Sequence, residues 1–207
     1  MRLIKLKNNL LLFFLLLVFY SSSAQSISSE NQLLKFKQFS LSQGLSQSSV
    51  LCMLQDSKGF MWFGTRDGLN KYDGHTFRTY RLDLKDENSI SNSFIRSLFE
   101  DENGNIWIGT SNGLNKYLPN NDNFKRYKHN ELDNSLINNE IWSITSASKN
   151  FPWVGTNEGL EKFNTIAGNS KHIKNGDDLL KNQIRSLFKD SKDNLWICNR
   201  ENIAIFY

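Results

Sequence analysis

Carboxylate and guanidinium side chains recur at regular distances along this chain of 207 residues. Aspartates stand six positions before a tryptophan at Asp56, Asp101 and Asp190, and arginines occupy matching places at Arg96 and Arg185. Hydrolysis of a glycosidic bond would need such groups as a carboxylate pair that meets at one point. Residues that recur in every unit of a chain instead indicate architecture, because catalysis needs singular residues that converge. We therefore predict no catalytic residue, and an enzyme is the less favoured interpretation.

Thiol and imidazole side chains show no spacing that suits a metal. Cys52 and Cys198 both lie in predicted strands and are far apart, so we expect small buried hydrophobic residues rather than a disulfide framework. The three histidines, His75, His129 and His172, are equally scattered. The sequence predicts neither a metal site nor a cofactor.

The elements that carry these residues are copies of one unit. Trp62, Trp107, Trp153 and Trp196 are separated by 45, 46 and 43 residues, and similar sequence surrounds each of them. A period of this length is typical of propellers and other repeat architectures. An upstream run also recurs, as "SNSFIRSLFED" before the second tryptophan and "KNQIRSLFKD" before the fourth.

Each copy is expected to contain four short antiparallel strands joined by tight turns. In the first copy, Asp and Gly at the ends of the segment 56–59 supply the side-chain acceptor and the positive φ that a turn requires. The strand around Trp62 is apolar on both faces, so neighbouring sheets must cover it. We predict an all-β β-propeller, as a partial or four-bladed ring, with blades near residues 46–80, 91–127, 137–173 and 181–207. Solenoids are the rival architecture, but hairpins with tight turns fit propeller blades better.

The spacing D-x-x-G-x-x-W-x-G-T-x-x-G-L-x-x-Y is filled completely in the first two copies. It resembles the two-component regulator propeller repeat, and the resemblance covers roughly residues 33–207. The third and fourth copies depart from it: Ala147 replaces Asp, and Cys198-Asn199 replaces Gly-Thr. We expect a structural role at the repeat positions, which are Asp56, Gly59, Trp62, Gly64, Gly68, Asp101, Gly104, Trp107, Gly109, Gly113, Trp153, Gly155, Gly159, Asp190 and Trp196.

The resemblance implies the ligand-sensing part of a hybrid two-component regulator. In that family the propellers precede a membrane helix and a histidine kinase, and their ligands are breakdown products of complex polysaccharides. Carbohydrate or another small ligand, further blades, a membrane helix and a kinase are the partners it implies, and a homodimer is left open. The ligand-binding residues are not assigned, but they are expected in loops that differ between copies. Trp142, outside the repeat position, is interpreted first as core and second as a stacking residue.

Two interpretations of the chain's extent stay open. Residues 33–45 resemble the fourth strand of the first copy, so we expect an orphan ring-closing strand there. That strand would either complete the fourth copy in a four-bladed ring or close a blade of a longer sensor, which the resemblance to seven-bladed rings favours. A stand-alone secreted propeller that binds proteins or carbohydrates is an alternative, and a sialidase-like hydrolase is a weaker one.

The first 24 residues have the three parts of a secretory signal peptide. Arg2, Lys5 and Lys7 precede an apolar run, and Ala24 ends a small-residue cleavage site. A retained membrane anchor is the alternative, although the run is shorter than the roughly 20 residues of a spanning helix. Without this segment, basic and acidic residues nearly balance, so no nucleic-acid partner is predicted. We expect an exported, periplasmic protein comprising residues 25–207.

Overall fold

The computed structural model describes residues 35–173 and 182–207. The chain divides into two units, residues 1–38 and 39–207, and the second contains every described strand. The predicted signal peptide lies outside the described residues. In the described part of the chain, no helix is long and apolar enough to cross a membrane.

In the described residues, fifteen strands form four antiparallel sheets, in which neighbours along the chain pair with each other. Sheet one holds β1 (Val50–Gln55), β2 (Met61–Thr65), β3 (Gly68–Tyr72) and β4 (Phe77–Tyr80). Sheet two holds β5 (Ile95–Glu100), β6 (Ile106–Thr110), β7 (Gly113–Leu118) and β8 (Asn123–Tyr127). Sheet three holds β9 (Ile141–Ser148), β10 (Phe151–Thr156), β11 (Gly159–Asn164) and β12 (Asn169–His172). The last sheet has three strands, β13 (Ser186–Lys189), β14 (Leu195–Cys198) and β15 (Ile203–Phe206).

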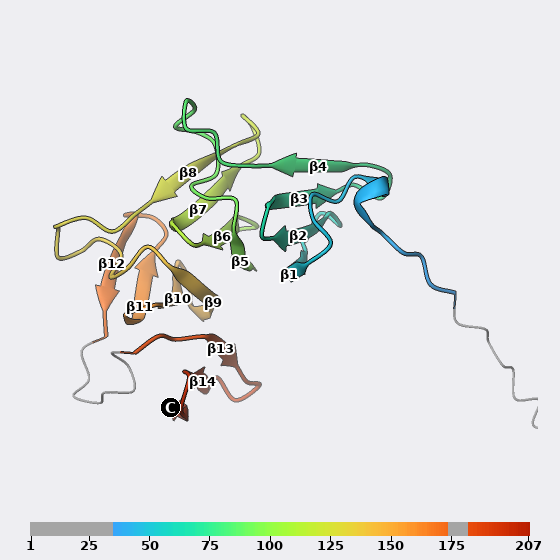
Figure 1. Cartoon of the computed structure of the whole chain (residues 1–207). Helices are drawn as coiled ribbons and strands as arrows, with labels where there is room; N and C mark the ends of the chain where they lie inside the picture. The colour runs from blue at the N-terminus through green and yellow to red at the C-terminus, as the bar shows by residue number, and fades with distance from the viewer. Residues whose placement is uncertain (1–34, 174–181) are drawn as a thin grey trace, which may run out of the picture. The chain divides into compact units, whose positions relative to one another are not determined.

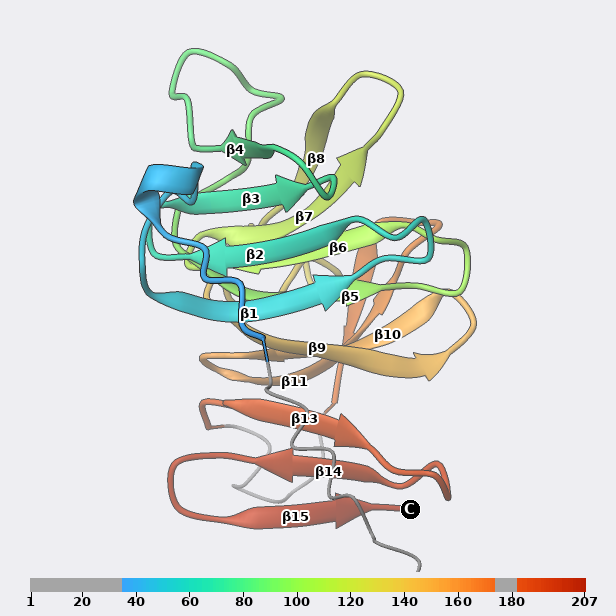
Figure 2. The ribbon, with the colours of Figure 1, turned by 90° about the vertical axis from the view of Figure 1, so that its right-hand side faces the viewer.

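The four sheets are the blades of a β-propeller, which confirms the predicted fold class. The first strand of each sheet contacts the first strand of the next, as β1 with β5, β5 with β9 and β9 with β13. Figure 1 shows these four strands nearest the centre of the second unit, with β4, β8 and β12 farther out. Figure 2 shows the blades from another side, with the strands of sheets one and two overlapping and the last sheet, β13 to β15, below the others. We number the blades one to four along the chain.

The core lies between the blades, where the repeated tryptophans are buried. Trp62 and Trp107 are fully buried, and each packs against aliphatic side chains of the following blade. The indole Nε1 of Trp62 donates to Asp56 over 2.8 Å, and Trp107 donates to Asp101 over the same distance. The other oxygen of each aspartate accepts backbone N–H groups of its own turn, so one carboxylate fixes both the turn and the ring.

The turns of the two divergent copies keep this backbone shape without glycine. Gly59 and Gly104 have φ of 89° and 74°, and their counterparts Asn150 and Asp193 have φ of 64° and 67°. Asparagine and aspartate tolerate this left-handed region better than other residues with a side chain. The repeat therefore retains its turn where the glycine is lost.

A glycine two residues after each of the first three tryptophans lets the next blade approach closely. A Cβ added at Gly109 would lie 2.7 Å from Cγ2 of Ile141 in blade three. Since Ile141 is fully buried, it has little room to move. We expect Gly109→Ala to lower the free energy of unfolding by about 1–3 kcal/mol, because overpacking strains a filled core. Urea denaturation followed by circular dichroism measures this, and a loss below about 0.5 kcal/mol would contradict the close packing.

The segment predicted as a ring-closing strand differs from that expectation. Residues 35–40 contain no strand, Leu41–Gln43 form the 3₁₀ helix η1, and residues 33 and 34 lie outside the described part. Ser40 and Gln43 form a capping box, and Gly44 ends the turn with φ of 105°, so local hydrogen bonding favours a helical turn here.

The similarity of this segment to β4 is nevertheless visible in its aromatic contacts. Phe39 packs edge-on against Tyr72 and Phe77, with ring centroids 5.0 and 5.6 Å apart. Tyr80, at the end of β4, contacts the corresponding Tyr117 and Phe124 of blade two at 6.0 and 5.2 Å. Phe39 thus occupies on blade one the place that an outer-strand tyrosine occupies on blade two.

Candidate ligand-binding face

Most residues at the repeat positions form contacts within a blade or between neighbouring blades. Gly68 and Gly113 have φ of 124° and 123°, and each donates its N–H to a carbonyl at the start of the next blade over 2.7 Å. In blade three, Gly159 has φ of 136°. Thr65 and Thr110 are buried and donate to the carbonyls of the glycines that follow them. These groups are engaged within the frame, so a ligand site must be sought elsewhere.

The turns between second and third strands lie beside the segments that lead into the inner strands. Backbone hydrogen bonds join the two sets, for example from Asn157 N–H to the Glu140 carbonyl and from Ile184 N–H to the Thr156 carbonyl. We call this end of the propeller the upper face, formed by residues 46–49, 66–67, 91–94, 111–112, 137–140, 157–158, 182–185 and 199–202. It combines the recurring segments before the inner strands with the turns between second and third strands, where the copies differ more.

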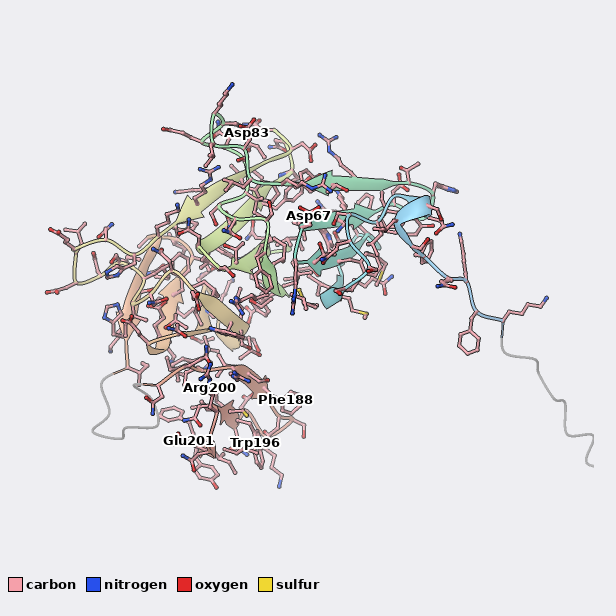
Figure 3. All side chains as sticks on the ribbon, in the orientation of Figure 1. Asp67, Asp83, Phe188, Trp196, Arg200 and Glu201 are labelled. Atoms are coloured by element: carbon pink, nitrogen blue, oxygen red, sulfur yellow. The ribbon has the colours of Figure 1, made fainter. Side chains whose placement is uncertain are left out.

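A polar pocket of about 400 Å³ opens on the upper face between blades three and four. Figure 3 shows two of its residues, Arg200 and Glu201, on the last blade. Its lining consists entirely of amide, guanidinium and carboxylate side chains, namely Asn157, Asn182, Gln183, Asn199, Arg200 and Glu201. Asn199 stands where the full repeat has threonine, so the pocket coincides with the strongest departure from the repeat.

Gln183 is the central group of this pocket. Its Nε2 donates to the Asn157 side chain over 2.8 Å. Its Oε1 accepts from Nε of Arg185 over 3.1 Å and from Nε of Arg200 over 2.9 Å. Asn199 is buried, and its side-chain oxygen accepts the N–H groups of Glu201 and Asn202, which fixes the turn that carries Arg200. The pocket therefore presents hydrogen-bonding groups that are already oriented.

A row of arginines and aromatic rings continues from the pocket along the upper face and the first residues of the inner strands. The Arg185 guanidinium carbon lies 5.6 Å from the Trp142 ring centroid, and that of Arg96 lies 3.7 Å from the same centroid. Arg96 also lies 4.5 Å from the Phe94 ring, which Arg66 of blade one approaches at 5.7 Å. These five residues come from all four blades and form one alternating stack, which we call the arginine row.

Trp142 differs from the core residue that the sequence favoured. Its side chain is half-buried between two guanidinium groups, and its buried Nε1 has no hydrogen-bond partner in the described part of the chain. Arg96, Trp142 and Arg185 follow Ile95, Ile141 and Ile184, so they share one position of the repeat, at or just before the start of successive inner strands. This shared position was the sequence signal that could have indicated the row, but the two arginines were interpreted there as structural.

Positive charge dominates this row. Arg96 lies 4.0 Å from Glu140, and its Nε donates to Ser111 over 3.0 Å. Burial lowers the pKa of the Arg96 guanidinium, the Glu140 charge opposes that shift, and the group stays cationic at neutral pH. Across residues 35–173 and 182–207, no acidic side chain lies within ion-pair distance of Arg66, Arg185 or Arg200.

The cysteines and histidines form no second site in the described residues. Cys52 and Cys198 are unpaired and half-buried, and burial raises the pKa of the Cys52 thiol to about 12. His129 and His172 bond to the carbonyls of Leu136 and Ser135, so both brace the loop before β9. No group of three or more His, Cys, Asp or Glu side chains is arranged there to hold a metal ion.

Comparisons with known proteins agree with this architecture. A family model described as two component regulator propeller matches residues 44–67, 89–112 and 178–201. A protein named histidine kinase P4, from Formosa agariphila, is 53% identical over 68 residues, which are 33% of this chain and 5% of that protein. The chain is thus similar to a small part of a much longer relative.

Two solved structures from B. thetaiotaomicron resemble the propeller. The extracellular domain of a putative hybrid two component system is 31% identical, with a TM-score of 0.73 over 82% of this chain and 24% of that one. The extracellular domain of a putative one component system is 21% identical, with a TM-score of 0.68 over 84% of this chain and 26% of that one. The second likeness concerns the fold alone. This chain spans about a quarter of each neighbour.

Proposed function

Because this chain carries two-component regulator propeller repeats, we propose that it is an extracytoplasmic sensor propeller that binds breakdown products of polysaccharides. The single observation that carries this proposal is the polar pocket at Gln183, one side of which is the turn at residues 199–201 that departs from the repeat. Amide, guanidinium and carboxylate side chains form directed hydrogen bonds with hydroxyl groups, and a sugar is rich in hydroxyl groups. The likeness to extracellular domains of two-component systems supports the assignment to sensing.

Sensing would work through differential binding. A ligand bound on the upper face would favour one placement of blades and domains over another, and a kinase elsewhere in a longer protein would read that difference. Further blades, a membrane helix and a kinase are part of this proposal, since the relatives are far longer than this chain. Export to the periplasm, with cleavage near Ala24, is proposed from the amino-terminal sequence.

Binding by the purified full chain tests the proposal. We expect isothermal titration calorimetry against a panel of plant and algal oligosaccharides to give saturable binding to at least one. Arg200→Ala is expected to weaken that binding by about tenfold, because a hydrogen bond from a charged donor is lost. Lys171→Ala, an exposed change on β12, is the matched control and should leave the affinity unchanged. Saturable binding that Arg200→Ala leaves intact would place the ligand elsewhere, and cleavage of the oligosaccharide would favour an enzyme.

A further inference from the structure

The arginine row holds cationic groups whose positions are fixed before any ligand arrives. Arg96 lies 3.7 Å from the Trp142 centroid and 4.5 Å from that of Phe94, so rings limit its movement on two sides. Arg185 lies near the opposite end of this stack, and its Nε is bonded to Gln183. A guanidinium stacked on a ring keeps its N–H edge available for a planar acceptor.

Two of these cations share one acceptor. Arg185 and Arg200 both donate their Nε to the Gln183 side-chain oxygen, and no acidic side chain in the described ranges neutralises either one. Glu201 lines the same pocket, but its carboxylate lies outside ion-pair distance of Arg200. Both guanidinium groups are exposed and carry charge of the same sign, so an anion bound between them would be attracted by both. A carboxylate or sulfate would accept from the remaining nitrogens of both groups.

We propose that the upper face binds an acidic oligosaccharide, with Arg185 and Arg200 as the groups that contact its carboxylates or sulfates. Arg66 provides a third exposed cation at the blade-one end of the same row, so several acidic sugars in sequence would be bound. Arg96 and Trp142 are positioning residues, since Arg96 is only 14% exposed and supports the ring on which Arg185 lies. This inference rests on the proposed function and narrows the class of ligand.

The test compares acidic and neutral saccharides of equal length on the full chain. The probes are trigalacturonate, a sulfated galactose trisaccharide and the neutral galactose trisaccharide, titrated by calorimetry at low and high NaCl. We expect an acidic probe to bind at least about tenfold more tightly than the neutral one. Raising NaCl should weaken the acidic probe selectively, because salt screens exposed charges. The two acidic probes distinguish carboxylate from sulfate as the preferred group.

Matched variants assign the contacts. Arg185→Ala and Arg200→Ala should each remove most of the preference for the acidic probe, whereas Arg185→Lys should restore part of it. Trp142→Leu should lower the affinity while leaving the salt dependence, since the charges remain. Lys171→Ala controls for a general loss of positive charge. Each variant is first required to melt at the temperature of the unsubstituted chain.

The outcomes separate the two proposals. Equal binding of neutral and acidic probes, or an acidic preference that survives Arg185→Ala and Arg200→Ala, would overturn this inference and leave the sensor proposal standing. Binding of the chain to vesicles with anionic lipid but to none of these probes, while a neutral oligosaccharide from the wider panel still binds, would also overturn the inference alone. Failure of every saccharide to bind would overturn both.

Discussion

Replacing Trp107 by alanine is expected to lower the free energy of unfolding by about 3–5 kcal/mol, which is the usual cost of removing a large aromatic side chain from a core. Trp107 is fully buried between blades two and three, and its indole is bonded to Asp101. The same substitution at Trp196 is expected to cost at most about 2 kcal/mol, since that residue is 38% exposed. Both tryptophans occupy the same position of the repeat.

Figure 3 shows Trp196 and Phe188 on the last blade, and Phe188 is also exposed. The difference between the two substitutions therefore measures what coverage by a following blade contributes. Urea denaturation monitored by far-ultraviolet circular dichroism gives both values. Equal losses for Trp107→Ala and Trp196→Ala would show that the tryptophans act within their own blades rather than between blades.

The second large effect concerns a carboxyl group buried in blade three. Glu161 stands where blades one and two have Asn70 and Asn115, whose side-chain oxygens accept the N–H groups of Ser46 and Ser91. The Glu161 side chain is fully buried and accepts from Ile137 N–H over 3.0 Å, while its Oε1 has no partner in the described residues. The imidazole of His172 lies beside this carboxyl group, with its Nε2 3.7 Å from Glu161 Oε2.

Burial raises the pKa of Glu161 from 4.5 to about 7, although the hydrogen bond from Ile137 N–H opposes the shift. A raised pKa in the folded state means that burial in the fold disfavours the ionised carboxylate relative to the neutral acid. Its contribution to stability is complete below pH 4.5 and is lost as the pH rises through about 7. Glu161→Gln removes the charge and should leave the protein about 3 kcal/mol more stable than the parent at pH 8.

Chemical denaturation of both proteins at pH 4.5 and pH 8 measures this difference. Titrating groups distant from residue 161 are common to the two proteins, so their contributions largely cancel in the comparison. The two proteins should have similar stability at pH 4.5 and should diverge as the pH rises. A difference that does not change with pH would contradict the assignment of a neutral, buried Glu161.

The sequence predicted the frame well because the frame is repeated. The spacing of tryptophans, the Asp-to-Gly turns and the doubly apolar second strands each reflect one local requirement met several times. Residues 33–45 were the exception, since similarity to β4 suggested a strand while Ser40 and Gln43 formed a capped helical turn. There a local hydrogen-bond preference overrode the register that the repeat implied.

The candidate site could be placed in the variable loops, but its residues could not be named in advance. Gln183 and Arg200 meet within blade four, and Asn157 joins them only because blades three and four pack against each other. Arg96 and Arg185 recur, so recurrence alone assigned them to the frame. Their common contact with Trp142 depends on side-chain directions between neighbouring blades, which a single sequence does not specify.

Hydrogen–deuterium exchange of the full chain, with and without a bound oligosaccharide, tests the central claim most directly. If the upper face is the sensing site, the ligand should slow exchange in residues 182–185 and 198–202, with the turns at 56–59 and 101–104 unchanged. Protection confined to those opposite turns, or unchanged exchange at saturating ligand, would contradict the account.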